Sequence, residues 1–182
     1  MYKNANPLLS LQWRSAENLS CWNDPEGNIE NILIPMLEIM RTLNAYSHIG
    51  LCCLDIKNIH ITDRTIKISG EKPSAKMNCN PVFIAPEIKM GCCKDTSLAI
   101  VYSIGAILYR KLFNTEPSVD YAELFSVINY SDSIFCSNLD KKSISLLDRF
   151  IHHTFTISKY ARWDLKRTVF EFEQILNSIR HL

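Results

Sequence analysis

The sequence contains few glycines and no excess of either charge, and both shortages exclude classes of function. Its 182 residues include five glycines, and no two of them are spaced as in a G-x-G-x-x-G or Walker-type loop. We therefore expect no glycine-rich loop that binds phosphate. Twenty basic and nineteen acidic side chains leave a formal net charge of +1. Since a nucleic-acid binder usually carries a strongly basic face, nucleic acid is not an expected partner.

Long hydrophobic runs are also lacking. The longest apolar stretch, Leu98 to Tyr109, is interrupted by Ser103 and is too short to cross a bilayer. The first residues, Met1 to Asn4, show no apolar signal core. From these features we expect a soluble, cytoplasmic protein without a membrane span.

Metal-binding and nucleophilic cysteine motifs are absent, although cysteine itself is not. The seven cysteines include the vicinal pairs Cys52-Cys53 and Cys92-Cys93, and no C-x-x-C spacing offers a tetrahedral zinc site. Nothing in the sequence aligns a cysteine with a histidine and an orienting carboxylate. We therefore expect reduced thiols in an intracellular compartment, packed as small hydrophobes, and no metal or cofactor.

Apolar spacing predicts a mainly helical fold. Apolar side chains recur every three or four residues, which is typical of amphipathic helices, over residues 29–43, 119–129, 143–155 and 164–180. Asn28 and Asp164 are candidate N-caps, and Pro35 should kink the first helix or mark its start. A further helix, near 97–112, is apolar on nearly every face and should lie at the centre of the domain. Within it, Gly105 should let another backbone approach closely.

One segment predicts strands instead. Residues 58–62 and 65–69 are β-branched runs with period-two alternation on either side of Asp63-Arg64, which indicates a small hairpin. A helical turn should start near Pro86, because proline suits the first helical position. Residues 1–28 should form an extended lead-in with at most one short helix, and residues 29–182 a single domain.

Three motifs occur in the order found in the C-terminal lobe of a protein kinase: Leu54-Asp55-Ile56-Lys57-Asn58, Phe83-Ile84-Ala85-Pro86-Glu87 and Tyr102-Ser103-Ile104-Gly105. The sequence thus resembles a kinase C-lobe from about residue 29 to 180. In that family, the glutamate of Ala-Pro-Glu pairs with an arginine before the last helix. The resemblance therefore implies an ion pair between Glu87 and Arg162.

The departures from the kinase pattern imply a protein that is not an enzyme. Twenty-eight residues precede the first predicted helix, whereas a kinase N-lobe needs about 60. We therefore expect no N-lobe, no glycine loop and no strand lysine to hold ATP. Cys53-Leu54-Asp55 stands where kinases have His-Arg-Asp, and no Asp-Phe-Gly follows the hairpin. Asp55, Lys57 and Asn58 are then a vestigial loop, held together by hydrogen bonds.

A C-lobe of this kind, opening with Ser10-Leu11, is similar to the kinase non-catalytic C-lobe domain, or KIND domain. That resemblance implies a protein-interaction module of signalling or cytoskeletal proteins, with a formin-like basic tail as one possible partner. Two alternatives stay open. One is a truncated pseudokinase decoy that binds a kinase or its substrate, and the other is an obligate subunit of a larger complex.

One acidic segment is a candidate for binding the partner. Asp120, Tyr121, Glu123 and Phe125 could receive a basic or apolar peptide, because aromatic anchors with a polar rim are usual in interfaces. The plainer alternative is a solvated helix whose aromatic side chains face the core.

Overall fold

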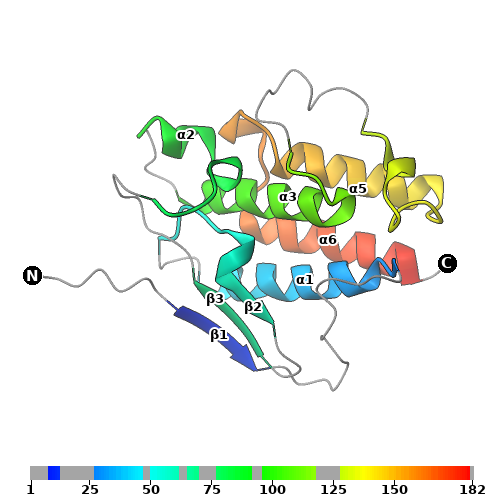
Figure 1. The fold of residues 1–182 in the computed structure, drawn as a ribbon, viewed down its shortest axis with the longest axis horizontal. Helices are drawn as coiled ribbons and strands as arrows, with labels where there is room; N and C mark the ends of the chain where they lie inside the picture. The colour runs from blue at the N-terminus through cyan, green and yellow to red at the C-terminus, as the bar shows by residue number, and fades with distance from the viewer. Residues whose placement is uncertain are drawn as a thin grey trace, which may run out of the picture.

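Helices make up most of the described chain, and a small antiparallel sheet packs at one end of them (Figure 1). The computed structural model describes residues 8–12, 27–46, 50–61, 65–69, 77–91, 96–117 and 128–180. Its longer helices run as follows: α1 Glu30–Ala45, α3 Ser97–Phe113, α5 Lys141–Thr154 and α6 Leu165–Arg180. The mainly helical class predicted from apolar spacing is therefore confirmed.

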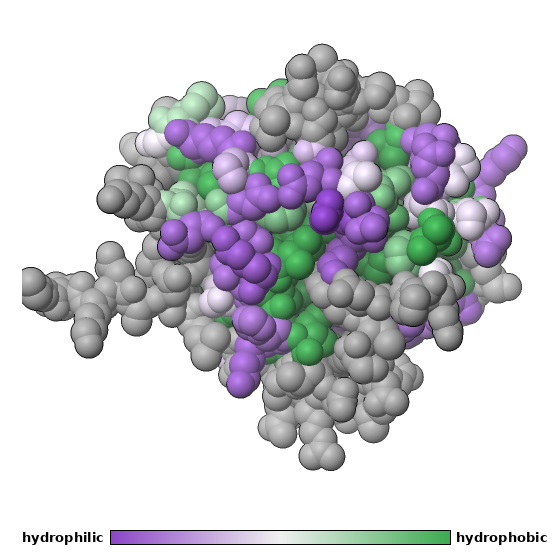
Figure 2. All heavy atoms as spheres, viewed as in Figure 1, coloured by the Kyte–Doolittle hydropathy of each residue, from purple (hydrophilic) through white to green (hydrophobic). Residues whose placement is uncertain are grey.

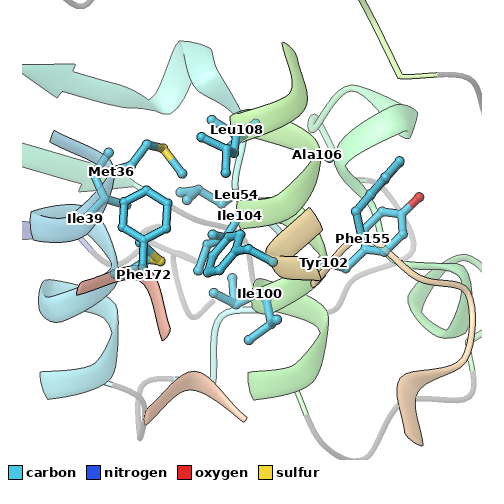
Figure 3. Close-up of a cluster of buried hydrophobic side chains, with 14 of the residues drawn as sticks. Met36, Ile39, Leu54, Ile100, Tyr102, Ile104, Ala106, Leu108, Phe155 and Phe172 are labelled. Carbon is cyan, nitrogen blue, oxygen red and sulfur yellow. The ribbon is translucent and has the colours of Figure 1, made fainter. Parts of the chain in front are cut away.

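The central position predicted for the 97–112 helix is confirmed by α3. Eleven of its seventeen residues are buried. Figure 3 shows Ile100, Ile104 and Leu108 near Met36 and Ile39 of α1 and Phe172 of α6, whereas Tyr102 lies beside Phe155. The helix thus contributes to the core on more than one side, as expected for a helix without a polar stripe.

Gly105 provides the close approach that its place in α3 predicts. A Cβ atom built on it would lie 2.5 Å from Thr154 Oγ1 and 2.8 Å from both the Cβ and the backbone nitrogen of Phe155. These distances leave no room for a side chain. The end of α5 can therefore pack against α3 only because residue 105 is glycine.

The first helix differs in detail from the sequence expectation. Ile29 is the N-cap residue, although the Asn28 side chain still accepts a hydrogen bond from the Glu30 backbone at 2.9 Å. Pro35 is buried inside α1, so it does not mark the helix start. The helix accommodates this proline in its second turn and continues to Ala45.

The predicted hairpin is confirmed, and a third strand extends it. Strands β2, Ile59–Ile61, and β3, Thr65–Ser69, pair antiparallel with Ile59 opposite Ile68. Strand β1, Leu8–Gln12, pairs antiparallel with the other edge of β3, so the order is β1-β3-β2. Ile66 and Ile68 are fully buried and Lys67 between them is exposed, as alternation requires. The expected lead-in therefore contributes a sheet strand.

Helix starts follow local chemistry. The short helix α2, Pro86–Lys89, has proline in its first turn as predicted. Asp164 accepts a hydrogen bond from the Arg167 backbone at 2.7 Å and begins α6, which confirms its role as a cap. Asp140 does the same for α5 through the Ser143 backbone at 2.7 Å. The helix predicted over 119–129 lies almost wholly outside the described residues.

The face of the molecule shown in Figure 2 carries both apolar and hydrophilic side chains. An apolar strip runs down the middle of this face, bordered by hydrophilic side chains. Among the described helices, none combines the length and the apolar character that a membrane crossing requires.

Candidate functional site

The residues of the kinase-like loop form a polar junction between two chain segments, 51–58 and 77–83. Asp55 is 4% exposed. Its Oδ1 accepts a hydrogen bond from the Lys57 backbone at 3.1 Å, and its Oδ2 accepts one from the Asn80 backbone at 2.7 Å. Both carboxylate oxygens are therefore engaged by backbone N–H groups within the protein.

The side chains of Lys57 and Asn80 extend this junction toward the surface. Lys57 Nζ lies 3.4 Å from Asp55 Oδ2 and donates to the backbone oxygen of Asn78. Asn80 Oδ1 accepts from the Val82 backbone and begins the turn η3, Pro81–Phe83. Its Nδ2 donates to Glu116 Oε1 at 3.0 Å. The side chains of Asp55, Lys57 and Asn80 thus all have partners on the protein itself.

Asn58 contributes to the same junction through its backbone. It ends the turn η2, Ile56–Asn58, where its N–H donates to Asp55 O at 2.9 Å. Its carbonyl accepts a hydrogen bond from Ser69 Oγ of β3 at 3.3 Å. Asp55, Lys57 and Asn58 therefore lie together, and their hydrogen bonds tie the loop to its surroundings.

A buried serine connects the junction to the central helix. Ser103 of α3 is fully buried, and its Oγ donates to Phe83 O at 2.7 Å while it accepts from the Leu54 backbone at 3.2 Å. One hydroxyl can donate once and accept twice, so a single serine can join both segments to α3. Sequence analysis placed Ser103 in a motif and missed this linking role.

The expectation of reduced thiols is not confirmed at the junction. Cys53 and Cys79 form a disulfide that joins the same two segments across 26 positions. The vicinal spacing of Cys52 and Cys53 said nothing about a partner so far away in the sequence. Cys52 and Cys136 are buried, as the packing expectation required, and burial raises the pKa of the Cys136 thiol.

Glu87 and Arg162 form the ion pair that the resemblance implies. Arg162 Nη1 lies 2.5 Å from Glu87 Oε1, and Nη2 lies 2.9 Å from Oε2. The Arg162 side chain is 0% exposed and its guanidinium lies 5.0 Å from the Tyr102 ring centroid. Fork-shaped pairs of this kind hold both partners in one orientation. The pair joins α2 to the segment before α6.

The two histidines of α5, His152 and His153, make contacts with neighbouring residues of the protein. His153 stacks on Trp163 with ring centroids 4.6 Å apart, and His152 Nδ1 lies 2.8 Å from the backbone oxygen of Asp148. Among the described residues, no group of three or more His, Cys, Asp or Glu side chains is arranged to hold a metal ion.

The described chain also contains a small hollow between α1 and α3. It has room for about one water molecule, and its lining consists of Leu43, Tyr46, Leu51, Ser97, Ile100 and Leu165. A hollow of that size is far below the volume that a small-molecule ligand needs. It carries no functional argument.

Sequence analysis missed three exposed apolar side chains on the two segments that the Glu87–Arg162 pair joins. Met90 is 67% exposed, Ile157 41% and Tyr160 88%. Ile157 and Tyr160 stand in a short segment between two amphipathic helices, where no periodic pattern can tell a core position from a surface one. The only sequence signal for exposure was a lysine directly before Met90 and another before Tyr160, Lys89 and Lys159, because charged neighbours favour a surface position.

The partner-binding residues proposed from sequence, Asp120, Tyr121, Glu123 and Phe125, lie outside the described residues. No protein-family model matches this sequence, and no curated protein resembles it closely enough to count as a relative.

Proposed function

We propose that this chain is a non-catalytic docking module of the pseudokinase type, similar to the KIND domain, which binds a segment of another protein. The observation that carries the proposal is the burial and hydrogen bonding of the Asp55 carboxylate. A general base must reach the proton that it removes. Asp55 is buried, and both of its oxygens accept backbone hydrogen bonds at the loop junction.

The surroundings of Asp55 support the same conclusion. Lys57 bonds to Asn78 and Asp55, and Asn80 bonds to Glu116. Phosphoryl transfer needs side chains that hold magnesium and nucleotide phosphates in line with the attacking group. Here the polar side chains hold two chain segments together. The junction thus suits a structural role, and the proposal assigns binding to other surfaces.

The ion pair between Glu87 and Arg162 and the central helix α3 fit the kinase C-lobe resemblance on which the proposal rests. In the proposal, α1, α3, α5 and α6 form the rigid body, and the acidic segment with Asp120 and Glu123 receives a basic or apolar segment of the partner. A formin-like tail, a kinase or a kinase substrate has suitable chemistry. As fold and function are only loosely linked, binding must be tested directly.

Protein capture with matched charge variants tests the docking surface. The tagged chain and its Asp120→Lys/Glu123→Lys variant are compared for specific retention of cytoplasmic proteins, and Asp24→Lys/Glu26→Lys reverses two acidic residues elsewhere in the sequence. The proposal expects a partner that is retained by the parent chain and the control and is lost from the first variant. Equal retention by all three chains would contradict the assignment of the acidic segment.

Nucleotide binding tests the non-catalytic part of the proposal. Melting is compared with and without magnesium and ATP, because a ligand at a hundred times its dissociation constant stabilises a protein by about 2.7 kcal/mol. We expect no shift. A shift that is lost in Asp55→Asn would contradict the proposal and would favour an active phosphotransferase.

The obligate-subunit alternative makes a different prediction. A subunit that folds only within an assembly should expose apolar surface and melt at a temperature that depends on its concentration. Melting at several concentrations of the isolated chain distinguishes it from a docking module, whose melting temperature should stay constant.

A further inference from the structure

The exposed apolar side chains near the Glu87–Arg162 pair stand on a rigid base. Arg162 binds Glu87 of α2 through two hydrogen bonds, and its Nη2 also donates to the backbone oxygen of Ile157 at 3.0 Å. The turn η5, Lys159–Ala161, precedes Arg162 directly and lies next to α2 in Figure 1. One buried guanidinium therefore holds the two segments in a defined arrangement.

Three large apolar side chains project from these two segments. Met90 follows α2, Ile157 precedes η5, and Tyr160 is its middle residue. Tyr160 is 88% exposed, whereas tyrosine usually keeps its ring at least partly buried. Exposed aromatic and aliphatic side chains grouped on a rigid base are typical of positions that anchor a partner.

The charges on the same two segments are all positive at the surface. The α2 segment, residues 86–91, contains Lys89, and the η5 segment, residues 155–163, contains Lys159. The one acid within these ranges, Glu87, is buried against Arg162. Asp164, which directly follows the second range, accepts a hydrogen bond from the Arg167 backbone as the cap of α6. Figure 2 shows hydrophilic and apolar side chains together at the end of the molecule where α2 lies.

The two lysines have no carboxylate partner in the described part of the chain. Lys159 Nζ lies 5.2 Å from the Tyr160 ring centroid. The side-chain ammonium group of Lys89 makes no hydrogen bond or ion pair with any residue that the structure describes, and partial burial lowers its pKa. A partly desolvated ammonium group gains more from a carboxylate than a fully hydrated one does.

We propose that Lys89, Met90, Ile157, Lys159 and Tyr160 form a docking surface, the α2–η5 surface, for an acidic peptide segment with an apolar anchor residue. Carboxylates of the peptide pair with the two lysines, and its anchor residue covers Tyr160 and its apolar neighbours. Because Arg162 holds both segments in place beforehand, their backbone loses little conformational entropy on binding.

The apolar side chains decide between an acidic peptide and another polyanion. A nucleic-acid backbone offers phosphates to lysines, but it leaves Met90 and Ile157 without an apolar partner. A peptide offers carboxylates and an apolar side chain together. The α2–η5 surface shares no residue with the segment around Asp120 and Glu123, for which a basic partner was proposed, and the two proposals call for peptides of opposite charge.

Selection from a random peptide library tests the α2–η5 surface with the full chain. We expect enrichment of sequences with several Asp or Glu residues and one aromatic or large aliphatic residue. The enriched peptide is then synthesised, labelled and titrated by fluorescence anisotropy. A second peptide, in which the apolar anchor is replaced by serine, tests the role of the apolar side chains.

Variants of the chain locate the binding site. Lys89→Glu/Lys159→Glu and Tyr160→Ala should each weaken binding of the acidic peptide at least tenfold. Lys141→Glu/Lys142→Glu makes the same change of charge at the start of α5 and should change binding less than twofold. Unchanged melting temperatures show that the variants are folded.

Two results would overturn the α2–η5 surface. One is the absence of acidic peptides from the selected pool. The other is an acidic peptide whose binding is weakened equally by the variants at Lys89 and Lys159 and by those at Lys141 and Lys142. One form of the first result, enrichment of basic peptides alone with binding lost in Asp120→Lys/Glu123→Lys, would at the same time support the proposed function. The failures of the two proposals are thus distinguishable.

Discussion

Arg162 and Glu87 are joined by two parallel hydrogen bonds inside the protein, 75 positions apart in sequence. The other N–H groups of the guanidinium donate to the backbone oxygens of Thr156, Leu98 and Ile157 at 2.8, 3.1 and 3.0 Å. A single buried side chain therefore joins α2, the start of α3 and the segment between α5 and α6.

Replacement of Arg162 by alanine should strongly destabilise the fold. It leaves the buried Glu87 carboxylate unpaired, and breaking a buried pair in this way costs about 3–5 kcal/mol. Arg162→Lys should also destabilise the fold, because an ammonium group cannot form the fork and reach three carbonyls. Denaturant unfolding measures both losses. If Arg162→Lys unfolds at the same denaturant concentration as the parent chain, the fork does not contribute as described.

Side chains at position 105 should destabilise the fold in order of their size. A Cβ there meets Thr154 Oγ1 and Phe155 at 2.5–2.8 Å, and overpacking costs about 1–3 kcal/mol or more. Gly105→Leu should prevent folding, and Gly105→Ala should lower the melting temperature despite the better helix propensity of alanine. Circular dichroism on heating measures both effects. An unchanged melting temperature for Gly105→Leu would contradict the packing of α5 on α3.

Reduction of the Cys53–Cys79 bond should lower stability. The bond closes a loop of 26 positions, and the chain-entropy model assigns such a loop about 3.5 kcal/mol. Dithiothreitol should therefore lower the melting temperature of the parent chain and leave that of Cys53→Ser/Cys79→Ser unaffected. Intact mass before and after reduction provides a separate check, since the oxidised chain is lighter by two hydrogens. Equal masses would rule out the bond.

Asp140 should stabilise α5 in a way that depends on pH. Hydrogen bonds from the Ser143 side chain and backbone lower the pKa of Asp140 from its ordinary value of 3.8. A carboxyl group whose pKa falls on folding contributes stability above its unfolded pKa and loses it as the pH falls through the folded one. Asp140→Ala should therefore melt below the parent chain at pH 7, and the difference should shrink below about pH 4. A difference that stays constant across this range would exclude the charged cap.

Asp55 should contribute to stability and leave peptide binding nearly unchanged. Removal of its carboxylate leaves the backbone N–H groups of Lys57 and Asn80 without their acceptor, which costs about 1–3 kcal/mol for a buried group. Asp55→Ala should thus unfold at a lower denaturant concentration, and Asp55→Asn should lose less because it keeps an acceptor. Anisotropy titration with the acidic peptide should give the same affinity for both variants. A loss of affinity without a loss of stability would place Asp55 in a binding surface.

The sequence by itself determined the helices and the hairpin, because these depend on near neighbours. A few neighbouring residues are enough to show the apolar spacing of α1, α3, α5 and α6 and the alternation of β2 and β3. The same holds for the helix cap at Asp164. Gly105 was also recognisable, since a glycine inside an apolar helix must have a packing reason.

Only the tertiary structure decided which distant residues meet. No local pattern predicts the pairing of β1 with β3, the bond between Cys53 and Cys79 or the contacts of Ser103. The exposure of Tyr160 likewise depends on how the whole chain packs. The Glu87–Arg162 pair was expected through a family resemblance, and local chemistry alone would not have matched these two residues among many charges. The reason is physical: periodicity reports which face of an element is apolar, whereas the partner of that face depends on how the whole chain packs.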